Sequence, residues 1–261
     1  MQIADAQIIP SRFFPSFSDF ARSSVFFDVD GTLLDIKPSP QDVVADVGLK
    51  ALILHLIAKL DGALALISGR SIADVDRIFR PLLLPTAGLH GAEIRLPNGS
   101  HRYADSKAMD HARPSVHRFV ADNPGLVLED KGATLAVHYR MRPELASHVL
   151  SFMSSFAPAD DIAIQEGKFV VELKPALYDK STAIAEFCAI PPFIGRTPIF
   201  IGDDLTDEVG FAYVNAHGGA SLRIGYPEVS TLAHYLLPDP EHLRVFMAGL
   251  LDFDGDEDVR P

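Results

Sequence analysis

The chain has 261 residues, of which 48% are hydrophobic and 22% are charged. This composition is typical of a globular protein with a sizeable core, and it excludes a largely disordered chain. The formal net charge of -12 would repel a polyphosphate backbone, so we expect no nucleic acid partner.

Few features of the sequence bear on cellular location. The first residues include Asp5 and lack a basic stretch followed by a long apolar run, which predicts no secretory signal. No apolar stretch approaches the roughly 18 uninterrupted residues that span a bilayer. The single cysteine, Cys188, cannot form an internal disulfide, as suits a reducing compartment. We expect a cytoplasmic protein without a membrane partner, either a monomer or a weak dimer.

Strand and helix patterns alternate over the first third of the chain. Three apolar runs predict short strands buried on both faces, at 24–29, 63–67 and 82–86. Helical spacing of apolar residues predicts a helix over 43–60, and Ser71 with Asp74 predicts the capped start of another. This order predicts a parallel sheet with helices on its faces, in which ligands collect at the carboxyl ends of the strands.

The pattern changes in the middle of the chain. A helix is predicted over 143–156, and four short strands are predicted at 126–130, 134–139, 162–165 and 169–173. The last two strands would be joined by a turn at Glu166 and Gly167. Strands paired through short turns predict an antiparallel α+β domain, which we place at residues 106–176.

The first pattern then returns. Two strands are predicted at 197–201 and 219–224, and three helices at 180–188, from about 206, and at 241–251. We therefore expect an α/β protein with a parallel-sheet core, formed by residues 1–105 and 177–261. The α+β domain would be inserted in this core, which explains the pattern better than two tandem domains.

The first polar cluster follows the strand at 24–29. Asp28 and Asp30 lie two positions apart, and buried carboxylates are costly unless they are paired or bind a metal. An Asp can attack phosphorus to give an aspartyl-phosphate, and a neighbouring Asp can protonate the leaving oxygen and then activate water. Gly31 would let the backbone approach a ligand closely. The alternative is a helix cap or an ordinary turn rich in Asp and Gly.

Two further signals are weaker when taken alone. Ser68, Gly69 and Arg70 follow the second strand, where a hydroxyl and free amides at a helix start suit a phosphate oxygen. A loop and helix cap would look the same. Lys180 begins the helix that resumes the core, and a single lysine is normally a solvated charge.

The last cluster follows the strand at 197–201. Four carboxylates lie close together in sequence, on Asp203, Asp204, Asp207 and Glu208. They would repel one another unless a divalent cation lies among them, and hard oxygen ligands of this kind suit Mg²⁺. Asp207 and Glu208 could instead favour a helix N-terminus, whereas metal binding is the better interpretation for Asp203 and Asp204.

The four clusters together describe one site for phosphoryl transfer. They supply a nucleophilic Asp, an acid/base Asp, a hydroxyl, a Lys and carboxylates for Mg²⁺, and such reactions depend on positioning and charge neutralisation. The sequence has no Walker-type glycine loop, which argues against an ATP-using P-loop enzyme.

The order of DVDGT, ISGR, Lys180 and GDDLTDE resembles the four motifs of the haloacid dehalogenase (HAD) superfamily. The resemblance implies a Rossmannoid core, with Asp28 as nucleophile and Asp30 as general acid/base. It also implies that Ser68 and Lys180 hold and neutralise the phosphoryl group. The implied metal ligands are Asp28, the carbonyl of Asp30 and Asp203, supported by Asp204 and Asp207.

A narrower resemblance is to trehalose-6-phosphate phosphatases. It is carried by GLHGAE at 88–93, LEDKGATLAVHYR at 128–140, EGKFVVELKP at 166–175 and GDDLTDE. It implies that the inserted domain is a C2-type cap that contacts the sugar. The implied substrate-binding residues are Glu129, Lys131 and Glu172, with His90, His138 and Arg140, and with Thr32, Gly69, Arg70 and Gly91 near the phosphate. Without the resemblance, a solvated pair is the better interpretation of Glu129 and Lys131. Ser181 and Lys174 depart from the family pattern and remove no catalytic group.

The resemblance implies a Mg²⁺-dependent phosphatase that hydrolyses trehalose 6-phosphate. Several alternatives stay open. The substrate could be sucrose phosphate, mannosylglycerate phosphate or a monosaccharide phosphate, or the protein could be a phosphomutase. A non-catalytic sugar-phosphate sensor is the alternative from another class. Intact Asp28, Asp30, Lys180 and Asp203 argue against the sensor, which needs no nucleophile and no acid.

Overall fold

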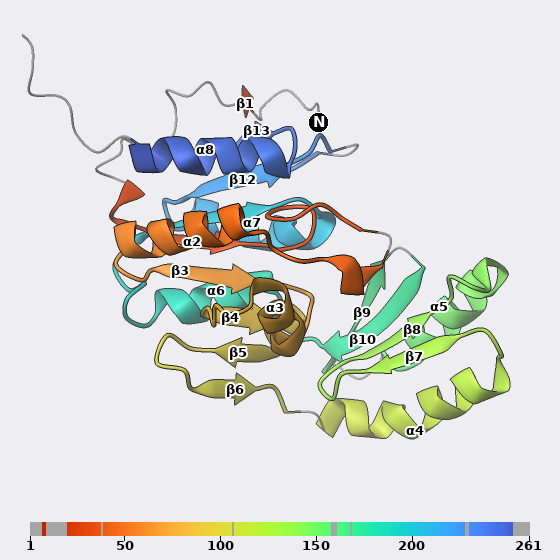
Figure 1. Ribbon diagram of the computed structural model, residues 1–261. Coiled ribbons are helices and arrows are strands. Elements are labelled where there is room, and N and C mark those ends of the chain that lie inside the picture. The colour runs from red at the N-terminus through yellow and green to blue at the C-terminus, as the bar shows by residue number, and fades with distance from the viewer. Residues whose placement is uncertain are drawn as a thin grey trace, which may run out of the picture. The chain divides into compact units, whose positions relative to one another are not determined.

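The computed structural model describes residues 7–8, 20–37, 39–105, 107–157, 161–167, 169–227 and 230–252. The chain forms two compact units, Met1–His101 with Lys180–Pro261, and Arg102–Asp179 (Figure 1). Most of the N-terminal segment used to predict the absence of a secretory signal lies outside the described residues. Among the helices that are described, none has the length and apolar character needed to cross a lipid bilayer.

The larger unit is built on a mainly parallel sheet. Its order is β1-β13-β12-β11-β2-β3-β4-β5-β6. The strands are β1 (Gln7–Ile8), β2 (Ser23–Phe27), β3 (Leu64–Ile67), β4 (Thr86–Gly88), β5 (Glu93–Arg95), β6 (His101–Tyr103), β11 (Thr197–Gly202), β12 (Ala220–Ile224) and β13 (Tyr235–Leu237). Every neighbouring pair from β1 to β4 is parallel, and β5 runs antiparallel to β4. The predicted parallel α/β core is confirmed.

The helices of the larger unit include two neighbouring pairs. The helices are α2 (Val47–Lys59), α3 (Ile72–Phe79), α6 (Lys180–Cys188), α7 (Glu208–Ala216) and α8 (Pro240–Asp252), with 3-10 turns η2 (Pro40–Asp42), η3 (Leu89–Gly91) and η5 (Leu205–Asp207). Helix α2 packs beside α8, and α6 beside α7 (Figure 1). Every residue of β2 and β3 is buried, which explains why residues 25–27 and 64–67 are apolar without alternation.

Several predicted boundaries are wrong. Helix α2 begins four residues later than predicted because Asp46 caps it, accepting a hydrogen bond from the amide of Leu49 at 2.8 Å. The third strand begins at Thr86 rather than at residue 82, and Leu83 before it is 72% exposed. The capped helix start at Ser71 is confirmed by its bond from the amide of Asp74. Strands β1, β5, β6 and β13 were not predicted.

The smaller unit is an antiparallel sheet with helices on one face. Its order is β7-β8-β10-β9, and all pairs are antiparallel. Its elements are α4 (Lys107–Asp122), β7 (Val127–Asp130), β8 (Leu135–His138), η4 (Pro143–Leu145), α5 (Ala146–Ser154), β9 (Ile162–Gly167) and β10 (Val170–Pro175). The predicted α+β character is confirmed. The turn predicted at Glu166 and Gly167 is wrong, because both pair with β10 inside strand β9.

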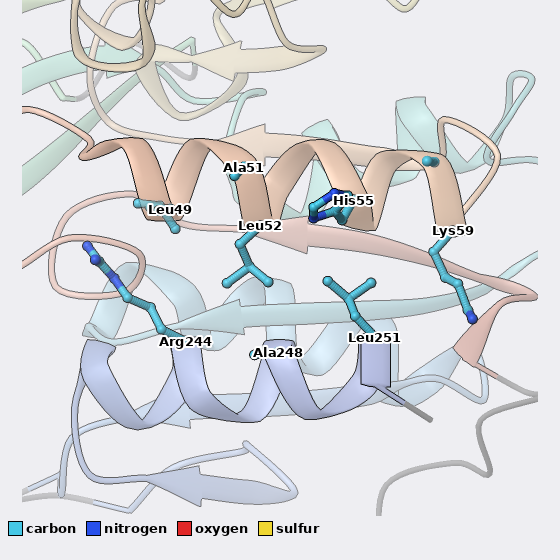
Figure 2. Close-up of a pocket in the computed structure, with 10 residues that line it drawn as sticks. Leu49, Ala51, Leu52, His55, Lys59, Arg244, Ala248 and Leu251 are labelled. Carbon is cyan, nitrogen blue, oxygen red and sulfur yellow. The ribbon is translucent and has the colours of Figure 1, made fainter. Parts of the chain in front are cut away.

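A groove of about 770 Å³ lies between α2 and α8 (Figure 2). Leu52 of α2 and Leu251 of α8 point toward each other across it, and His55, Lys59 and Arg244 supply its polar atoms. None of the described residues that line this groove carries a carboxylate. The groove therefore lacks the side-chain oxygen ligands that hard divalent cations prefer.

Candidate active site

The carboxyl edge of the parallel sheet gathers residues that are distant in sequence. Strands β2 and β11 are parallel neighbours with Phe27 opposite Ile201, so Asp28 and Asp203 follow them at the same edge. The amide of Asp28 also donates a hydrogen bond to the carbonyl oxygen of Ile201 at 2.8 Å. The topology thereby joins the first and the last predicted clusters in one site.

Gly31 permits the close approach of these two loops. Its φ is +78°, and a Cβ added there would lie 2.0 Å from Oδ2 of Asp203. Only glycine fits this position without displacing the carboxylate. The buried hydroxyl of Thr32 donates to Oδ1 of Asp203 at 3.3 Å, so the loop after β2 also orients Asp203.

Lys180 lies at the start of α6 between two buried carboxylates. Its Nζ donates to Oδ1 of Asp28 at 2.8 Å and to Oδ1 of Asp207 at 2.6 Å, and the residue is only 3% exposed. Burial alone would lower the pKa of Lys180, but the charges of Asp207 and Asp28 outweigh it and raise that pKa. Lys180 is therefore a permanent positive charge beside Asp28, and not a solvated surface residue.

The carboxylates around Lys180 fit a divalent cation. Oxygen atoms of Asp28, Asp203 and Asp207 lie within 4.8 Å of one another. Burial raises the pKa of Asp28 and of Asp207, and burial together with the charges of Asp207 and Asp204 raises the pKa of Asp203 to about 7. Three carboxylates around one ammonium leave two negative charges uncompensated, which a hard divalent cation with oxygen ligands would balance.

The remaining predicted carboxylates of this loop have structural roles. Oδ2 of Asp207 accepts hydrogen bonds from the amides of Asp203 at 2.9 Å and Asp204 at 3.0 Å. Oδ1 of Asp204 accepts from the amide and the hydroxyl of Thr206, and so caps η5. Asp204 is exposed and lies outside the group of three carboxylates, whereas Asp207 both belongs to it and orders the loop.

Asp30 is paired with an arginine of the second predicted cluster. Arg70 donates from Nε to Oδ2 of Asp30 at 2.5 Å and from a terminal nitrogen to Oδ1 at 2.6 Å. The amide of Arg70 donates to Oγ of buried Ser68 at 3.1 Å. The loop after β3 therefore brings a hydroxyl and a guanidinium to the same carboxyl edge as Asp28.

A strained turn supports this loop. Leu89 and His90 both have positive φ, 48° and 56°, and conformations of this kind cost about 1–3 kcal/mol each. The amide of His90 donates to the carbonyl oxygen of Ser68 at 2.9 Å, and that of Leu89 to Arg70. A Cβ at Gly69 would lie 2.7 Å from Nε2 of His90, so the imidazole packs against the loop that carries Ser68. Gly91 follows in the same buried turn.

One face of the smaller unit's sheet carries polar side chains. Apolar residues of its other face pack with α4 and α5, at Leu135, Val137, Ile162, Val171 and Leu173. Because side chains alternate along a strand, Glu129, Ala136 and Glu172 share the opposite face and stand in register across β7, β8 and β10. Two of the three predicted sugar-contacting residues therefore share this polar face.

A connected polar network lies on this face. Nζ of Lys131 lies 3.7 Å from Glu129 and 3.5 Å from Oε1 of Glu172, between the two carboxylates. Nε2 of His138 lies 3.0 Å from Oε2 of Glu129, and this bond is the main cause that lowers the pKa of Glu129. The hydroxyl of Thr134 donates to Oε1 of Glu172 at 2.6 Å. The interpretation of Glu129 and Lys131 as a solvated pair is therefore incomplete, because Lys131 also lies beside Glu172.

Arg140 lies beyond the end of β8, with its guanidinium 5.8 Å from the centre of the Phe169 ring. It is exposed. Thr134 was not predicted as a site residue, although it lies two positions before Ala136. The period-two pattern of β8 could have placed it on the same face as Glu172.

The sequence is similar to those of several known phosphatases. A family model described as trehalose-phosphatase matches residues 26–239. A probable trehalose-phosphate phosphatase of Sinorhizobium fredii is 42% identical over 236 residues, covering 89% of each chain. The trehalose-6-phosphate phosphatase of Escherichia coli K12 is 44% identical over 209 residues, covering 78% of each chain.

Solved structures show the same fold. A trehalose-6-phosphate phosphatase related protein is 26% identical with a TM-score of 0.68, covering 87% of this chain and 96% of that one. The C-terminal domain of the Candida albicans trehalose-6-phosphate phosphatase has a TM-score of 0.75 at 19% identity, covering 90% and 95%. A HAD-like hydrolase of Bacteroides thetaiotaomicron has a TM-score of 0.64. With its HAD-like fold and this match over most of its length, the chain belongs to the trehalose-phosphatase family.

Proposed function

We propose that the protein is a Mg²⁺-dependent phosphatase that hydrolyses trehalose 6-phosphate to trehalose and phosphate. The observation that carries this proposal is the buried group of Asp28, Asp203, Asp207 and Lys180, in a chain of the trehalose-phosphatase family. This group joins an oxygen nucleophile to a fixed positive charge and to ligands for a cation. A non-catalytic sensor would not need a nucleophile together with a fixed positive charge and cation ligands.

The reaction proceeds in two displacements at phosphorus. A carboxylate oxygen of Asp28 attacks the phosphorus atom, and the bond from phosphorus to the sugar oxygen breaks. Asp30 gives its proton to that oxygen, and trehalose leaves. Water then attacks the aspartyl-phosphate while Asp30 takes its proton, the bond from phosphorus to Asp28 breaks, and phosphate leaves with Asp28 regenerated. Lys180 neutralises charge at the phosphoryl oxygens throughout.

Arg70 has to release Asp30, and Asp30 has to take up a proton from solvent, before Asp30 can act as an acid, because both carboxylate oxygens accept hydrogen bonds from Arg70 in the structure. A phosphoryl group offers the guanidinium an alternative set of acceptor oxygens. Substrate binding would therefore transfer Arg70 from Asp30 to the phosphate. Ser68, whose Oγ accepts from the amide of Arg70, would bind a phosphoryl oxygen beside it.

Asp28, Asp203 and the carbonyl of Asp30 would hold Mg²⁺, with Asp207 ordering the loop that carries Asp203. The bound cation would supply charge neutralisation at the phosphoryl group. The fit is electrostatic: the cluster has an excess of negative charge, and burial makes that excess costly.

The smaller unit supplies the sugar contacts in this proposal. Glu129, Lys131 and Glu172 form a network of acceptors and donors on the polar face of the sheet, as sugar hydroxyls require. As a cap, this unit would exclude bulk water from the aspartyl-phosphate when it closes.

Phosphate release from a panel of substrates tests the proposal directly. We expect rapid hydrolysis of trehalose 6-phosphate in Mg²⁺, and much slower hydrolysis of sucrose 6-phosphate, glucose 6-phosphate and 4-nitrophenyl phosphate. EDTA should abolish all four activities. Equal rates for the aryl phosphate and trehalose 6-phosphate would contradict the sugar assignment and keep the phosphatase chemistry. An isomerised sugar phosphate without free phosphate would instead identify a phosphomutase, and binding without turnover would identify a sensor.

The stabilisation by Mg²⁺ should depend on pH. Because the pKa of Asp203 is raised from 3.8 to about 7, the native protein without metal binds more protons here than the unfolded chain between these values. The contribution of Asp203 to the free energy of unfolding therefore falls as pH rises through this window. Above pH 7 the ionised carboxylate can bind Mg²⁺, and a hundredfold excess over Kd adds about 2.7 kcal/mol to the free energy of unfolding.

Thermal unfolding at pH 5.5 and pH 8, with Mg²⁺ or EDTA, measures this effect. We expect a clear rise in Tm with Mg²⁺ at pH 8 and a much smaller one at pH 5.5. Asp203→Asn should remove most of the difference between the two pH values. Equal stabilisation at both pH values would show that ionisation of Asp203 does not control cation binding.

A further inference from the structure

Thr134 stands out among the residues of the smaller unit because it is fully buried and polar. It precedes β8, and its hydroxyl donates a hydrogen bond of 2.6 Å to Oε1 of Glu172. Glu172 itself is 7% exposed, which is unusual for a carboxylate. The two residues are 38 positions apart and are brought together by the pairing of β8 with β10.

The other partner of Glu172 is a weaker support. Nζ of Lys131 lies 3.5 Å from the same Oε1, at the limit of a hydrogen bond, and is shared with Glu129 at 3.7 Å. A hydrogen bond from a neutral hydroxyl to a buried carboxylate is short and strong by comparison. Thr134 is therefore the contact that sets the orientation of the Glu172 carboxylate.

This arrangement leaves the second oxygen of Glu172 for a ligand. Both described contacts, from Thr134 and Lys131, are made to Oε1, and no described residue donates to Oε2. A carboxylate with one oxygen held and the other available accepts a hydroxyl hydrogen bond without having to be ordered first. Such preorganisation lowers the entropic cost of binding.

We propose that Thr134 is a positioning residue for sugar recognition, which holds Glu172 so that Oε2 accepts a hydrogen bond from a hydroxyl of the disaccharide. The inference rests on the proposed function, because it assigns the ligand of Glu172 to the sugar. Thr134 itself touches no reacting atom. Its effect should appear in the choice between substrates with and without the sugar.

Two substitutions separate the hydroxyl from the rest of the side chain. Thr134→Val keeps the shape and removes the donor, whereas Thr134→Ser keeps the donor. We expect Thr134→Val to raise KM for trehalose 6-phosphate roughly tenfold, with a smaller change in kcat, because the carboxylate loses its partner. The ratio of kcat/KM between trehalose 6-phosphate and 4-nitrophenyl phosphate should fall by a similar factor. Thr134→Ser should restore most of this ratio.

The larger unit offers a matched control. The hydroxyl of Thr231 donates to Oε1 of Glu208 at 2.7 Å, so Thr231→Val removes an equivalent hydrogen bond. It should leave the substrate ratio unaltered, even if both rates change. In a Glu172→Gln background, Thr134→Val should have little additional effect on the ratio, because the two residues act through one contact.

Three outcomes are distinguishable in steady-state kinetics with these two substrates. A wild-type protein that shows no preference for trehalose 6-phosphate contradicts the proposed function. A preference that Thr134→Val leaves intact overturns the positioning role alone. A ratio that falls equally in Thr134→Val and Thr134→Ser, with a lower Tm in both, would show that Thr134 acts only through packing, and this too would overturn the inference.

Discussion

Asp28→Asn is expected to lower phosphate release from trehalose 6-phosphate by at least about 10⁴-fold, because the amide cannot form the aspartyl-phosphate. Asp28 directly follows β2, is 5% exposed and accepts a hydrogen bond from Lys180 at 2.8 Å. An asparagine has nearly the same shape and can keep its oxygen toward Lys180. The loss should therefore be chemical, with the local structure preserved.

The same substitution should not unfold the protein. The cluster of Asp28, Asp203, Asp207 and Lys180 carries more negative than positive charge, and burial raises the pKa of Asp28. Removing one carboxylate reduces this repulsion, so Tm measured in EDTA should be unchanged or higher. Asp61→Asn is a suitable control, since its side chain is 80% exposed and pairs with Arg196 at the surface.

Activity and mass should be measured on the same preparation, because deamidation of the introduced asparagine would regenerate the aspartate and restore the enzyme. A variant that retains full activity while its mass shows an intact amide would contradict the assignment of Asp28 as nucleophile. A variant with a strongly reduced Tm would instead place the role of Asp28 in the fold.

Lys180→Met is expected to reduce both activity and stability. It leaves Asp28 and Asp207 buried without their common cation, and breaking a buried ion pair in this way costs about 3–5 kcal/mol. We expect the free energy of unfolding to fall by that amount in EDTA. Turnover should fall by about a thousandfold or more, since the phosphoryl charge loses its fixed counterion.

Two further variants show whether charge is the cause. Lys107→Met removes an ion pair with Asp105 at the surface, where Lys107 is 86% exposed, and should change stability by less than about 1 kcal/mol. Adding Asp207→Asn to Lys180→Met should recover part of the lost stability without restoring activity, because it removes one of the unpaired buried charges. Full activity of Lys180→Met would exclude the proposed role of this lysine in phosphoryl binding.

Local patterns were sufficient to identify most of the parallel core. Apolar runs marked β2, β3 and β11, a strand was predicted at 219–224 where β12 lies, and α6 begins and ends where the sequence predicts. Edge elements were missed because their signals are weak: β6 is fully exposed, and α4 has Pro114 within it. Its apolar residues Met109, Ala112, Val116 and Phe119 have helical spacing, which shows that the pattern was present and was obscured by the proline.

The sequence by itself determined the chemistry available to this protein. It supplied carboxylates directly after buried strands, a hydroxyl and an arginine after another, and motifs that resemble one family. The family motifs also pointed to Glu129, Lys131 and Glu172, which a residue-level interpretation alone would have left as solvated charges. These inferences need only local order, because a strand's end and the residue types beside it are read in one short segment.

Tertiary structure decided which of these groups act together. The role of Lys180 follows from its contacts with Asp28 and Asp207. These contacts form only when α6 packs beside the carboxyl edge of β2 and β11. The different roles of Asp207 and Asp204 likewise depend on how their loop folds. The hydrogen bond from Thr134 to Glu172 depends on the pairing of β8 with β10. Charge balance, burial and pKa are properties of neighbours in space, so no single segment of the sequence contains them.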